Sequence, residues 1–293
     1  MRKKIKIRDL AFKTISCTIV LFFTIICLIP FMIVVSGSLS SEKTILLNGF
    51  HVLPQDFSLD AYRFILENPS DILNGYKITI TITVVGTGLS LLFTSMAAYV
   101  LSRQDFQWRN KIAFFMYFTT LFHAGLVPYY IWMNQLGMRN NIASMIIPSM
   151  LTVNYIFIFR NFVRTIPYEI TESGMLDGAN DLQIYFRLIL PLTKPGFATI
   201  GLFQALNYWN SWYNCMLYID KREMWTLQYY LQRMIQDAQA VLQYEGMIGS
   251  FTVLPSETVK LAMAILTTGP IILLYPFIQK YFVKGMVVGA VKG

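Results

Sequence analysis

Charged side chains are scarce in this sequence, and their scarcity limits what the chain can be. Only 14% of the 293 residues are Asp, Glu, Lys or Arg, whereas 55% are hydrophobic. Soluble domains carry about 25% charged residues, so this balance indicates a membrane protein. Six windows contain no charged residue over at least 19 positions. Each window is long enough to cross a bilayer as a helix, which needs about 20 predominantly apolar residues.

The six windows predict an all-α polytopic membrane protein with six transmembrane helices. Inside a bilayer only helices and closed β-barrels satisfy every backbone hydrogen-bonding group, and runs of this length exclude the short strands of a barrel. The predicted spans cover about residues 11–35, 77–101, 111–133, 141–163, 195–219 and 259–282. Residues 36–76 and 220–258 are expected to be external loops, and residues 1–293 a single transmembrane domain.

Several chemistry-bearing motifs are absent. The odd set Cys17, Cys27 and Cys215 argues against a disulfide framework or a metal site, and packing roles within the spans are expected. No Gly-x4-Gly-Lys-Ser/Thr phosphate loop, His-Glu-x-x-His site or intramembrane carboxylate pair occurs, so we expect no enzyme activity and no cofactor in this chain. His123, inside a predicted span, could serve either a proton pathway or a hydrogen bond to a neighbouring helix.

The chain has a formal net charge of +8, and the distribution of its 24 Lys and Arg residues along the sequence shows why. With both termini in the cytoplasm, the inner segments hold 16 of these residues and the outer segments hold 8. Cytoplasmic segments of membrane proteins carry such an excess, so we expect both termini and residues 160–194 to be cytoplasmic. Because the basicity follows topology, we expect no nucleic-acid partner.

Residues 166–195 are a polar stretch between two predicted spans, and their order predicts two short helices joined by a turn. Glu172 falls in the first helix, near N–H groups that a carboxylate stabilises. Gly178 can take the left-handed conformation that ends a helix, and Asn180 can cap the next one. Pro191 is expected to stop that second helix. On these residues alone, a well-capped interhelical loop explains the stretch equally well.

The spacing of this stretch carries a resemblance. Glu172-Ser173-Gly174, three residues, Gly178, nine residues and then Leu188-Ile189-Leu190-Pro191 resembles the EAA loop of permease subunits in ATP-binding-cassette (ABC) importers. The family pattern is Glu-Ala-Ala, three residues, Gly, nine residues, Ile-x-Leu-Pro. The chain departs from it at Ser173, Gly174 and Leu188.

The resemblance implies a type I ABC importer transmembrane domain with a cytoplasmic coupling helix that docks on an ATPase dimer. ATP and Mg would then be bound by that partner. The coupling residues it implies are Glu169, Glu172, Ser173, Gly174, Asp177, Gly178, Ala179, Leu190 and Pro191. The other implied partners are a second permease subunit, an extracytoplasmic solute-binding protein, an oligosaccharide and the bilayer of a bacterial cell membrane.

The surroundings of the loop resemble the carbohydrate branch of this family. They include Ile166-Pro167, Asp177-Gly178-Ala179 and the ending from Tyr275 to Phe282, and the similarity extends over the whole chain. The related permeases beside lipoprotein receptors include importers of uronic-acid oligomers. The six charge-free windows offer no cationic side chain that could bind an acidic sugar. Selection of such a sugar would therefore fall to the partner permease or receptor. A polytopic membrane receptor or assembly factor without transport remains the alternative.

The predicted span over residues 195–219 carries unusual polar side chains. Aromatic faces with amides bind sugars, but an aromatic belt with interhelical hydrogen bonds explains them equally well. The pathway candidates are Asn207, Asn210 and Asn214, which share a helical face, and Trp209 and Trp212. These five positions wrap around a helix, so they are not all expected to face one cavity.

The external segment over residues 220–258 is too apolar for a solvated linker, which implies packing on a partner. In maltose-type permeases the equivalent loop reaches into the cleft of the receptor. The resemblance therefore implies receptor contacts here, for which the candidates are Gln236, Ala238, Gln243, Gly246 and Gly249. The two glycines are expected to make this part of the segment flexible.

Overall fold

The computed structural model describes residues 7–67, 69–122, 124–248 and 257–273. Helices account for nearly all regular structure in these residues, and their only strand-like feature is an isolated bridge between Ser40 and Phe57. The all-α prediction is therefore confirmed. The chain divides into two compact units, Met1–Pro69 with Arg233–Gly269 and Ser70–Gln232 with Pro270–Gly293.

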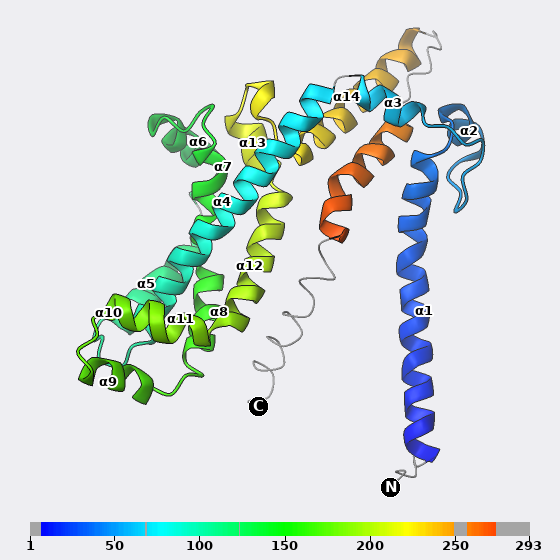
Figure 1. Cartoon of the computed structure of the whole chain (residues 1–293). Coiled ribbons are helices and arrows are strands. Elements are labelled where there is room, and N and C mark those ends of the chain that lie inside the picture. The colour runs from blue at the N-terminus through cyan, green and yellow to red at the C-terminus, as the bar shows by residue number, and fades with distance from the viewer. Residues whose placement is uncertain (1–6, 68, 123, 249–256, 274–293) are drawn as a thin grey trace. The chain divides into compact units, whose positions relative to one another are not determined.

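The first unit contains a long apolar helix, shown in blue in Figure 1. Its helices are α1 (Ile7–Ser38), α2 (Glu42–Asn48), α3 (Asp60–Leu66) and the C-terminal part of α14 (Leu227–Ile248), together with the helical residues from 257 onward. The Glu42 carboxylate accepts the backbone N–H groups of Glu257 and Thr258 at 2.9 and 2.8 Å. These two bonds join α2 to the helical residues that follow residue 256.

Cysteines occupy different surroundings in the two units. Cys17 and Cys27 lie on exposed faces of α1, whereas Cys215 is fully buried in the second unit. The predicted packing role therefore holds for Cys215, whereas Cys17 and Cys27 are not packed by any residue that the structure describes. The reason is that α1 is apolar around its whole circumference, so an apolar position there does not indicate a packed one.

The second unit is organised along one long helix, α4. Its helices are α4 (Pro69–Ser102), α5 (Arg109–Leu121), α6 (Leu126–Gln135), α7 (Ala143–Met150), α8 (Val153–Val163), α9 (Glu169–Leu176), α10 (Asp181–Gln183), η1 (Ile184–Ile189), α11 (Leu190–Leu192), α12 (Lys194–Trp209), α13 (Tyr213–Tyr218), η2 (Arg222–Met224) and the start of α14. The helices from α9 to α11 gather near the C-terminal end of α4, and α13 lies toward its N-terminal end (Figure 1).

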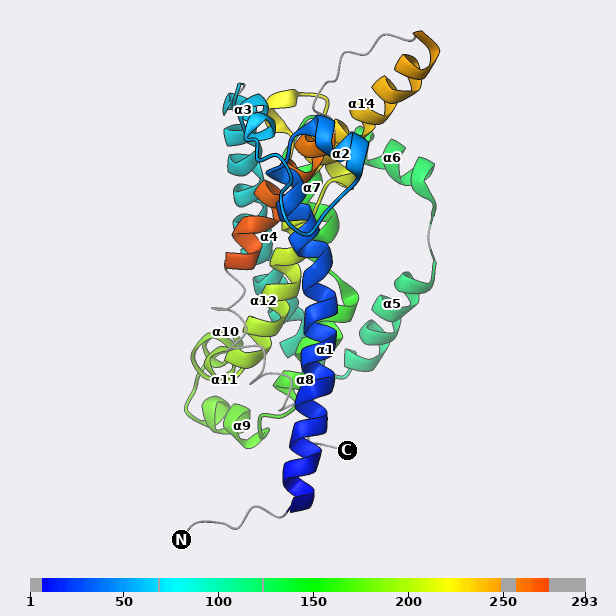
Figure 2. The same ribbon diagram turned by 90° about the vertical axis from the view of Figure 1, so that its right-hand side faces the viewer.

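Three predicted spans are not single helices in the structure. Residues 111–133 divide between α5 and α6, which Figure 2 shows as separate helices. Residues 141–163 divide between α7 and α8 with a bend of 51°. The span over residues 195–219 is interrupted between α12 and α13. Pro148 predicts a bend in the second of these spans, and the bend lies just after it. Hydropathy carries no information on whether a helix is continuous, so the other two breaks were not predicted.

Two helices are long and apolar enough to cross a membrane among the residues described, Phe12–Ser38 within α1 and α4. The number rises to four if each of the bent pairs, α5 with α6 and α7 with α8, crosses as one span. The last predicted span reaches beyond residue 273, and His123 also falls outside the described residues. Six spans therefore remain a prediction.

Helices α4 and α12 approach closely at Gly86. The Tyr208 ring of α12 packs against this glycine, and its hydroxyl donates a hydrogen bond to the Ile146 carbonyl at 2.8 Å. The ring is 1% exposed, so it has no free space into which it could withdraw. A residue without a side chain is needed at such a contact, as is usual where membrane helices pack tightly.

Gly86→Ala is expected to lower the free energy of unfolding by about 1–3 kcal/mol, the usual cost of overpacking. An added Cβ would lie 2.7 Å from the Cζ atom of Tyr208. Gly88→Ala is the matched control, because a Cβ there meets nothing within 4 Å. Thermal unfolding of both variants in detergent checks the expectation, and equal melting temperatures would contradict it.

Candidate functional site

The turn after α9 has the geometry of a Schellman motif. Gly178 has φ +77°, its N–H donates to Met175 O at 3.0 Å, and the Ala179 N–H donates to Gly174 O at 3.0 Å. This pair of bonds satisfies the last carbonyl groups of the helix and requires a left-handed residue, which glycine adopts without strain. The predicted role of Gly178 in ending the first helix is confirmed.

The next helix begins with a capping box. The Asn180 side chain accepts the Gln183 N–H at 2.9 Å, and the Gln183 side chain accepts the Asn180 N–H at 2.9 Å. The predicted cap at Asn180 is therefore confirmed, and Gln183 is the partner that the sequence reading missed. The signal for it was the glutamine three residues after the cap.

Pro191 does not stop the second helix, and that prediction is wrong. The chain continues helically through α11 to Leu192. A proline ring clashes with the carbonyl four residues earlier in a regular α-helix. Here the π-helical segment η1 precedes the proline and changes the spacing of those backbone groups, so the ring is accommodated.

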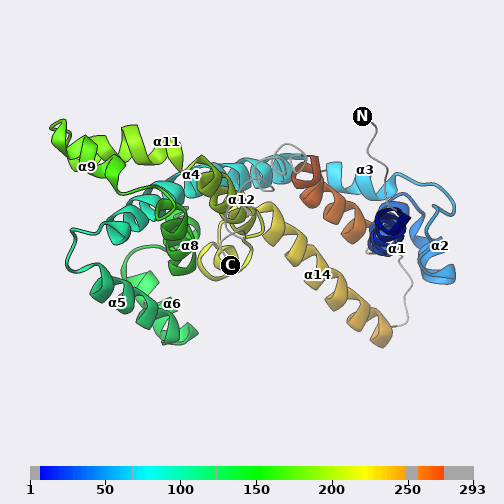
Figure 3. The same cartoon turned by 90° about the horizontal axis from the view of Figure 1, so that it is seen from below.

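The two helices of this coupling loop, residues 166–195, lie side by side (Figure 3), and their outward faces are exposed. Glu169, Glu172 and Asp177 are all exposed on or just after α9. Leu176 is 89% exposed despite being apolar. Further exposed apolar side chains follow at Leu182, Phe186 and Leu192. An apolar face rimmed by carboxylates is typical of a surface that another protein covers.

The inward face ties the coupling loop to α4. Tyr185, only 2% exposed, shares a hydrogen bond of 2.6 Å with the Ser95 hydroxyl of α4. Buried apolar residues of η1 pack in one cluster with residues of α4, α8 and α12. The loop is therefore anchored to the helices that would carry its movement into the membrane.

Arg103, just after α4, forms a second anchor that sequence reasoning missed. Its guanidinium pairs with the carboxylates of Asp105 and Asp181, and the Tyr168 hydroxyl donates to Asp105 at 3.2 Å. The hydrogen bond to Asp105 raises the pKa of Arg103, and the same contact lowers the pKa of Asp105. Charge-assisted pairs of this kind fix geometry strongly. No motif links residues so far apart in sequence.

Two departures from the family pattern touch each other. An added Cβ at Gly174 would lie 2.9 Å from Cδ1 of Leu188, which is tighter than normal packing. The small residue at position 174 and the leucine at position 188 are therefore complementary. The family pattern has Ala at position 174 and Ile at position 188. There the larger residue at position 174 is combined with a side chain of a different branching at position 188.

Gly174→Ala is expected to lower the uptake that the family resemblance implies. The added methyl group would meet Leu188 and Ile184 at 2.9 and 3.1 Å, at a cost of about 1 kcal/mol, the lower end for overpacking. Adding Leu188→Ile should restore uptake, since the combination recreates the family pair. Uptake rates of the two single variants and the double variant form the test. Strict additivity of the two effects would contradict this coupling.

A cavity of about 500 Å³ lies where α12 gives way to α13. It is lined by Ser149, Phe203, Leu206, Asn207, Asn210, Ser211, Trp212, Tyr213 and Asn214, none of which is charged. Four of the five pathway candidates thus meet at one cavity, whereas Trp209 is buried and does not line it. Ser149, Ser211 and Tyr213 are lining residues that were not among the candidates.

The three amides differ in their bonding. Asn210 donates to Leu206 O at 2.9 Å and accepts from Gln228 at 3.2 Å, so its side chain is held in place. Asn207 and Asn214 make no side-chain hydrogen bond to any residue that the structure describes. Their amides can therefore bond to a ligand, each as donor and as acceptor.

The receptor-contact candidates lie on or beyond α14. Gln236 is exposed, and Ala238, Gln243 and Gly246 are helical. Gly246 lies within α14, which continues to Ile248, and its expected flexibility stays a prediction. Gly249 lies outside the described residues.

No family model matches the chain, but individual relatives do. It is 36% identical to the polygalacturonan/rhamnogalacturonan transport system permease protein YtcP of Bacillus subtilis, across 93% of this chain and 95% of YtcP. It is 34% identical to the protein LplC of the same organism, across 92% and 90% of the two chains.

A solved structure agrees with these relatives. The chain superposes with a TM-score of 0.81 and 31% identity on a chain of a bacterial ABC transporter involved in the import of the acidic polysaccharide alginate. The match covers 94% of this chain and 98% of that one. The two chains therefore share one fold over nearly their full lengths.

Proposed function

Because the chain belongs to the sugar permease family of ABC importers, we propose that its coupling loop transmits ATPase closure to a sugar pathway beside α12 and α13. As a member of this family the chain is an inner-membrane permease, not an enzyme, and ATP hydrolysis is carried out by a separate ATPase subunit. The system also includes a binding protein and a second permease.

The observation that carries the coupling proposal is the rigid exposed face of α9. Glu172 and Leu176 point outward from a helix whose end is fixed by the Schellman turn, while Tyr185 and Arg103 anchor the inner side. To transmit a movement of the ATPase, the coupling loop needs an exposed surface that contacts the ATPase and a rigid attachment to the membrane-spanning helices. We assign the docking contact with the ATPase to the coupling residues from Glu169 to Ala179, and the attachment to Leu190 and Pro191.

The topology follows from this assignment. Docking on an ATPase puts α9 in the cytoplasm, and the excess of Lys and Arg in the segments on the same side puts both termini there. The external loops then hold α2, α3 and most of α14. We place the receptor contacts of Gln236, Ala238, Gln243, Gly246 and Gly249 on this outer side.

The substrate proposed is an oligosaccharide that contains uronic-acid residues. YtcP is named for polygalacturonan and rhamnogalacturonan, and the solved transporter for alginate, all of them acidic. The cavity beside α12 offers neutral amides, hydroxyls and aromatic rings, which suit sugar hydroxyls and C–H faces. Recognition of the carboxylates then lies with the second permease or the binding protein.

A competition experiment tests the substrate class. Cells carrying the complete importer take up labelled oligogalacturonate, and unlabelled uronate oligomers should reduce that uptake while neutral malto-oligosaccharides of equal length should not. The expected discrimination arises because a binding site for carboxylates leaves its cationic groups unpaired with a neutral sugar. Equal competition by both sugars, or no oligogalacturonate uptake at all, would contradict the proposal.

A further inference from the structure

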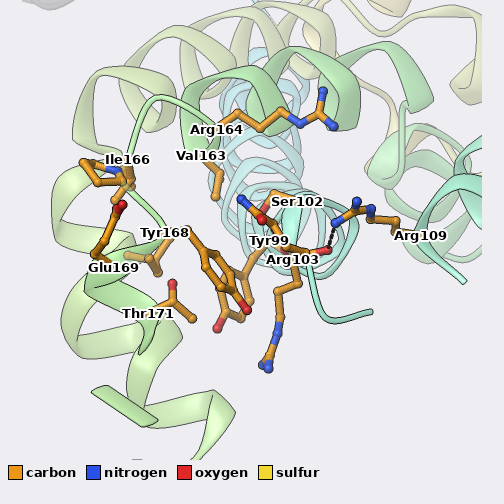
Figure 4. A pocket seen from close by; sticks show the side chains of 13 residues that line it. Tyr99, Ser102, Arg103, Arg109, Val163, Arg164, Ile166, Tyr168, Glu169 and Thr171 are labelled. Carbon is orange, nitrogen blue, oxygen red and sulfur yellow. Dashed lines mark hydrogen bonds between the residues drawn. The ribbon is translucent and has the colours of Figure 1, made fainter. Parts of the chain in front are cut away.

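A second cavity, of about 590 Å³, lies beside the coupling loop. It opens among the end of α4, the start of α5, the end of α8 and the segment leading into α9 (Figure 4). Three arginines line it, Arg103, Arg109 and Arg164, against a single carboxylate, that of Glu169. The cavity is therefore basic, and its position is apart from the amide-lined cavity of the proposed sugar pathway.

Two of these arginines have no acidic partner among the residues described. Arg103 is neutralised by Asp105 and Asp181, but Arg109 and Arg164 form no ion pair with a described carboxylate. Arg109 instead donates to the backbone oxygen of Arg103 at 2.8 Å, the dashed line in Figure 4. Both arginines line the same cavity, and guanidinium groups without acidic partners repel each other unless an anion lies between them.

Two further groups beside this cavity lack hydrogen-bond partners. Arg160, one helical turn before Arg164, has a buried Nε atom with no partner in the described part of the chain, and the charges of Arg109 and Arg164 act on it. The Tyr99 hydroxyl, on a side chain only 5% exposed that lines the cavity, has Arg103 beside it but donates to no acceptor among the described residues. A buried donor without an acceptor is costly, so a bound acceptor in this cavity would stabilise the site.

The neighbourhood of the cavity matches the level of lipid headgroups. Trp108 is exposed just before α5, and the Lys111 ammonium lies 4.6 Å from the centre of its ring. Further along α5, Phe114, Phe115 and Phe118 are exposed and apolar. Tryptophan and lysine at the interface with phenylalanines beyond them are the pattern of a helix that enters a bilayer at this point.

We propose that this basic cavity binds the phosphate headgroup of an anionic phospholipid of the inner leaflet, with Arg109 and Arg164 as its cationic ligands. The Tyr99 hydroxyl is a further donor, and the acyl chains lie along the exposed phenylalanines of α5. Guanidinium groups suit phosphate because they donate two parallel hydrogen bonds. The proposal takes only the cytoplasmic orientation of α9 from the proposed function. A lipid in this site would contact the coupling loop through Tyr168.

Native mass spectrometry of the complete purified importer tests this site. The complex is titrated with phosphatidylglycerol, with phosphatidylcholine and with inorganic phosphate. In the Arg109→Gln/Arg164→Gln variant, phosphatidylglycerol affinity should fall about tenfold or more, because two charge-assisted bonds are lost. The control variant Lys43→Gln/Arg63→Gln removes two exposed charges elsewhere and should bind phosphatidylglycerol like the wild type.

The other outcomes decide the source of the anion. Unchanged phosphatidylglycerol binding in the glutamine variant overturns the proposal, and so does binding of inorganic phosphate without any binding of phosphatidylglycerol. If the glutamine variant loses the ATPase subunit but binds lipid like the wild type, the two arginines bind an acidic side chain of that subunit and the lipid proposal is overturned. If the glutamine variant does not assemble, Arg109→Lys/Arg164→Lys should still prefer phosphatidylglycerol to phosphatidylcholine, and equal binding overturns the proposal. Lipid binding is measured in the absence of sugar and ATP. A negative result for the lipid site can therefore be distinguished from a negative result for the proposed transport function.

Discussion

Gly178→Val lowers ATP-driven sugar uptake by about tenfold or more while the complex still binds its receptor. Gly178 has φ +77°, a conformation that costs an L-residue about 1–2 kcal/mol, and the β-branch of valine makes it worse. No atom lies within 4 Å of an added Cβ, so the penalty comes from the backbone alone. The turn must then change, which moves α9 and Glu172 away from the proposed contact with the ATPase. Uptake by cells carrying the variant is the measurement.

Gly178→Asn is the matched control for this turn. Asparagine visits the left-handed region far more readily than valine does, so it should retain most of the uptake. Equal uptake by the valine variant and the wild type would show that the turn geometry is irrelevant to coupling. Residues 166–195 would then be only a well-capped loop between helices, without a role in coupling.

Asn207→Ala/Asn214→Ala lowers the apparent affinity of uptake for sugar by about tenfold, at the level of two lost hydrogen bonds of about 0.5–1.5 kcal/mol each. Both amides line the cavity beside α12 and make no side-chain hydrogen bond within the described chain. Their loss should therefore leave folding unaffected. The concentration dependence of uptake in cells distinguishes an affinity effect from a change in maximal rate.

Asn110→Ala provides the comparison for the amide variants. Asn110 is exposed on α5 and lines neither of the two cavities described above. Its uptake curve should superimpose on that of the wild type. If the double amide variant also behaves like the wild type, the asparagines serve only as contacts between helices and the sugar pathway lies elsewhere.

The coupling loop could be predicted closely because its structure depends on local chemistry. The left-handed turn at Gly178 and the cap at Asn180 each depend on one residue and its immediate neighbours. The continuation of the helix through Pro191 could not be predicted in this way. It depends on the π-helical turn η1, whose residues are also held by packing against α4.

The amide-lined cavity beside α12 was predicted in part. Helical spacing brought Asn207, Asn210 and Asn214 together correctly, and all three line the cavity. The burial of Trp209 depends on where α12 ends, at a break that no local signal marked. The anchor of Arg103 on Asp181 joins residues 78 positions apart, and such long-range pairs are invisible without the fold.

The most direct test of coupled sugar import uses proteoliposomes that contain the complete importer, with ATP inside and the sugar-loaded binding protein outside. The wild type should accumulate labelled sugar only when ATP is present, whereas Glu172→Ala should hydrolyse ATP without accumulating sugar. Sugar accumulation without ATP, or accumulation by Glu172→Ala at the wild-type rate, would contradict the account.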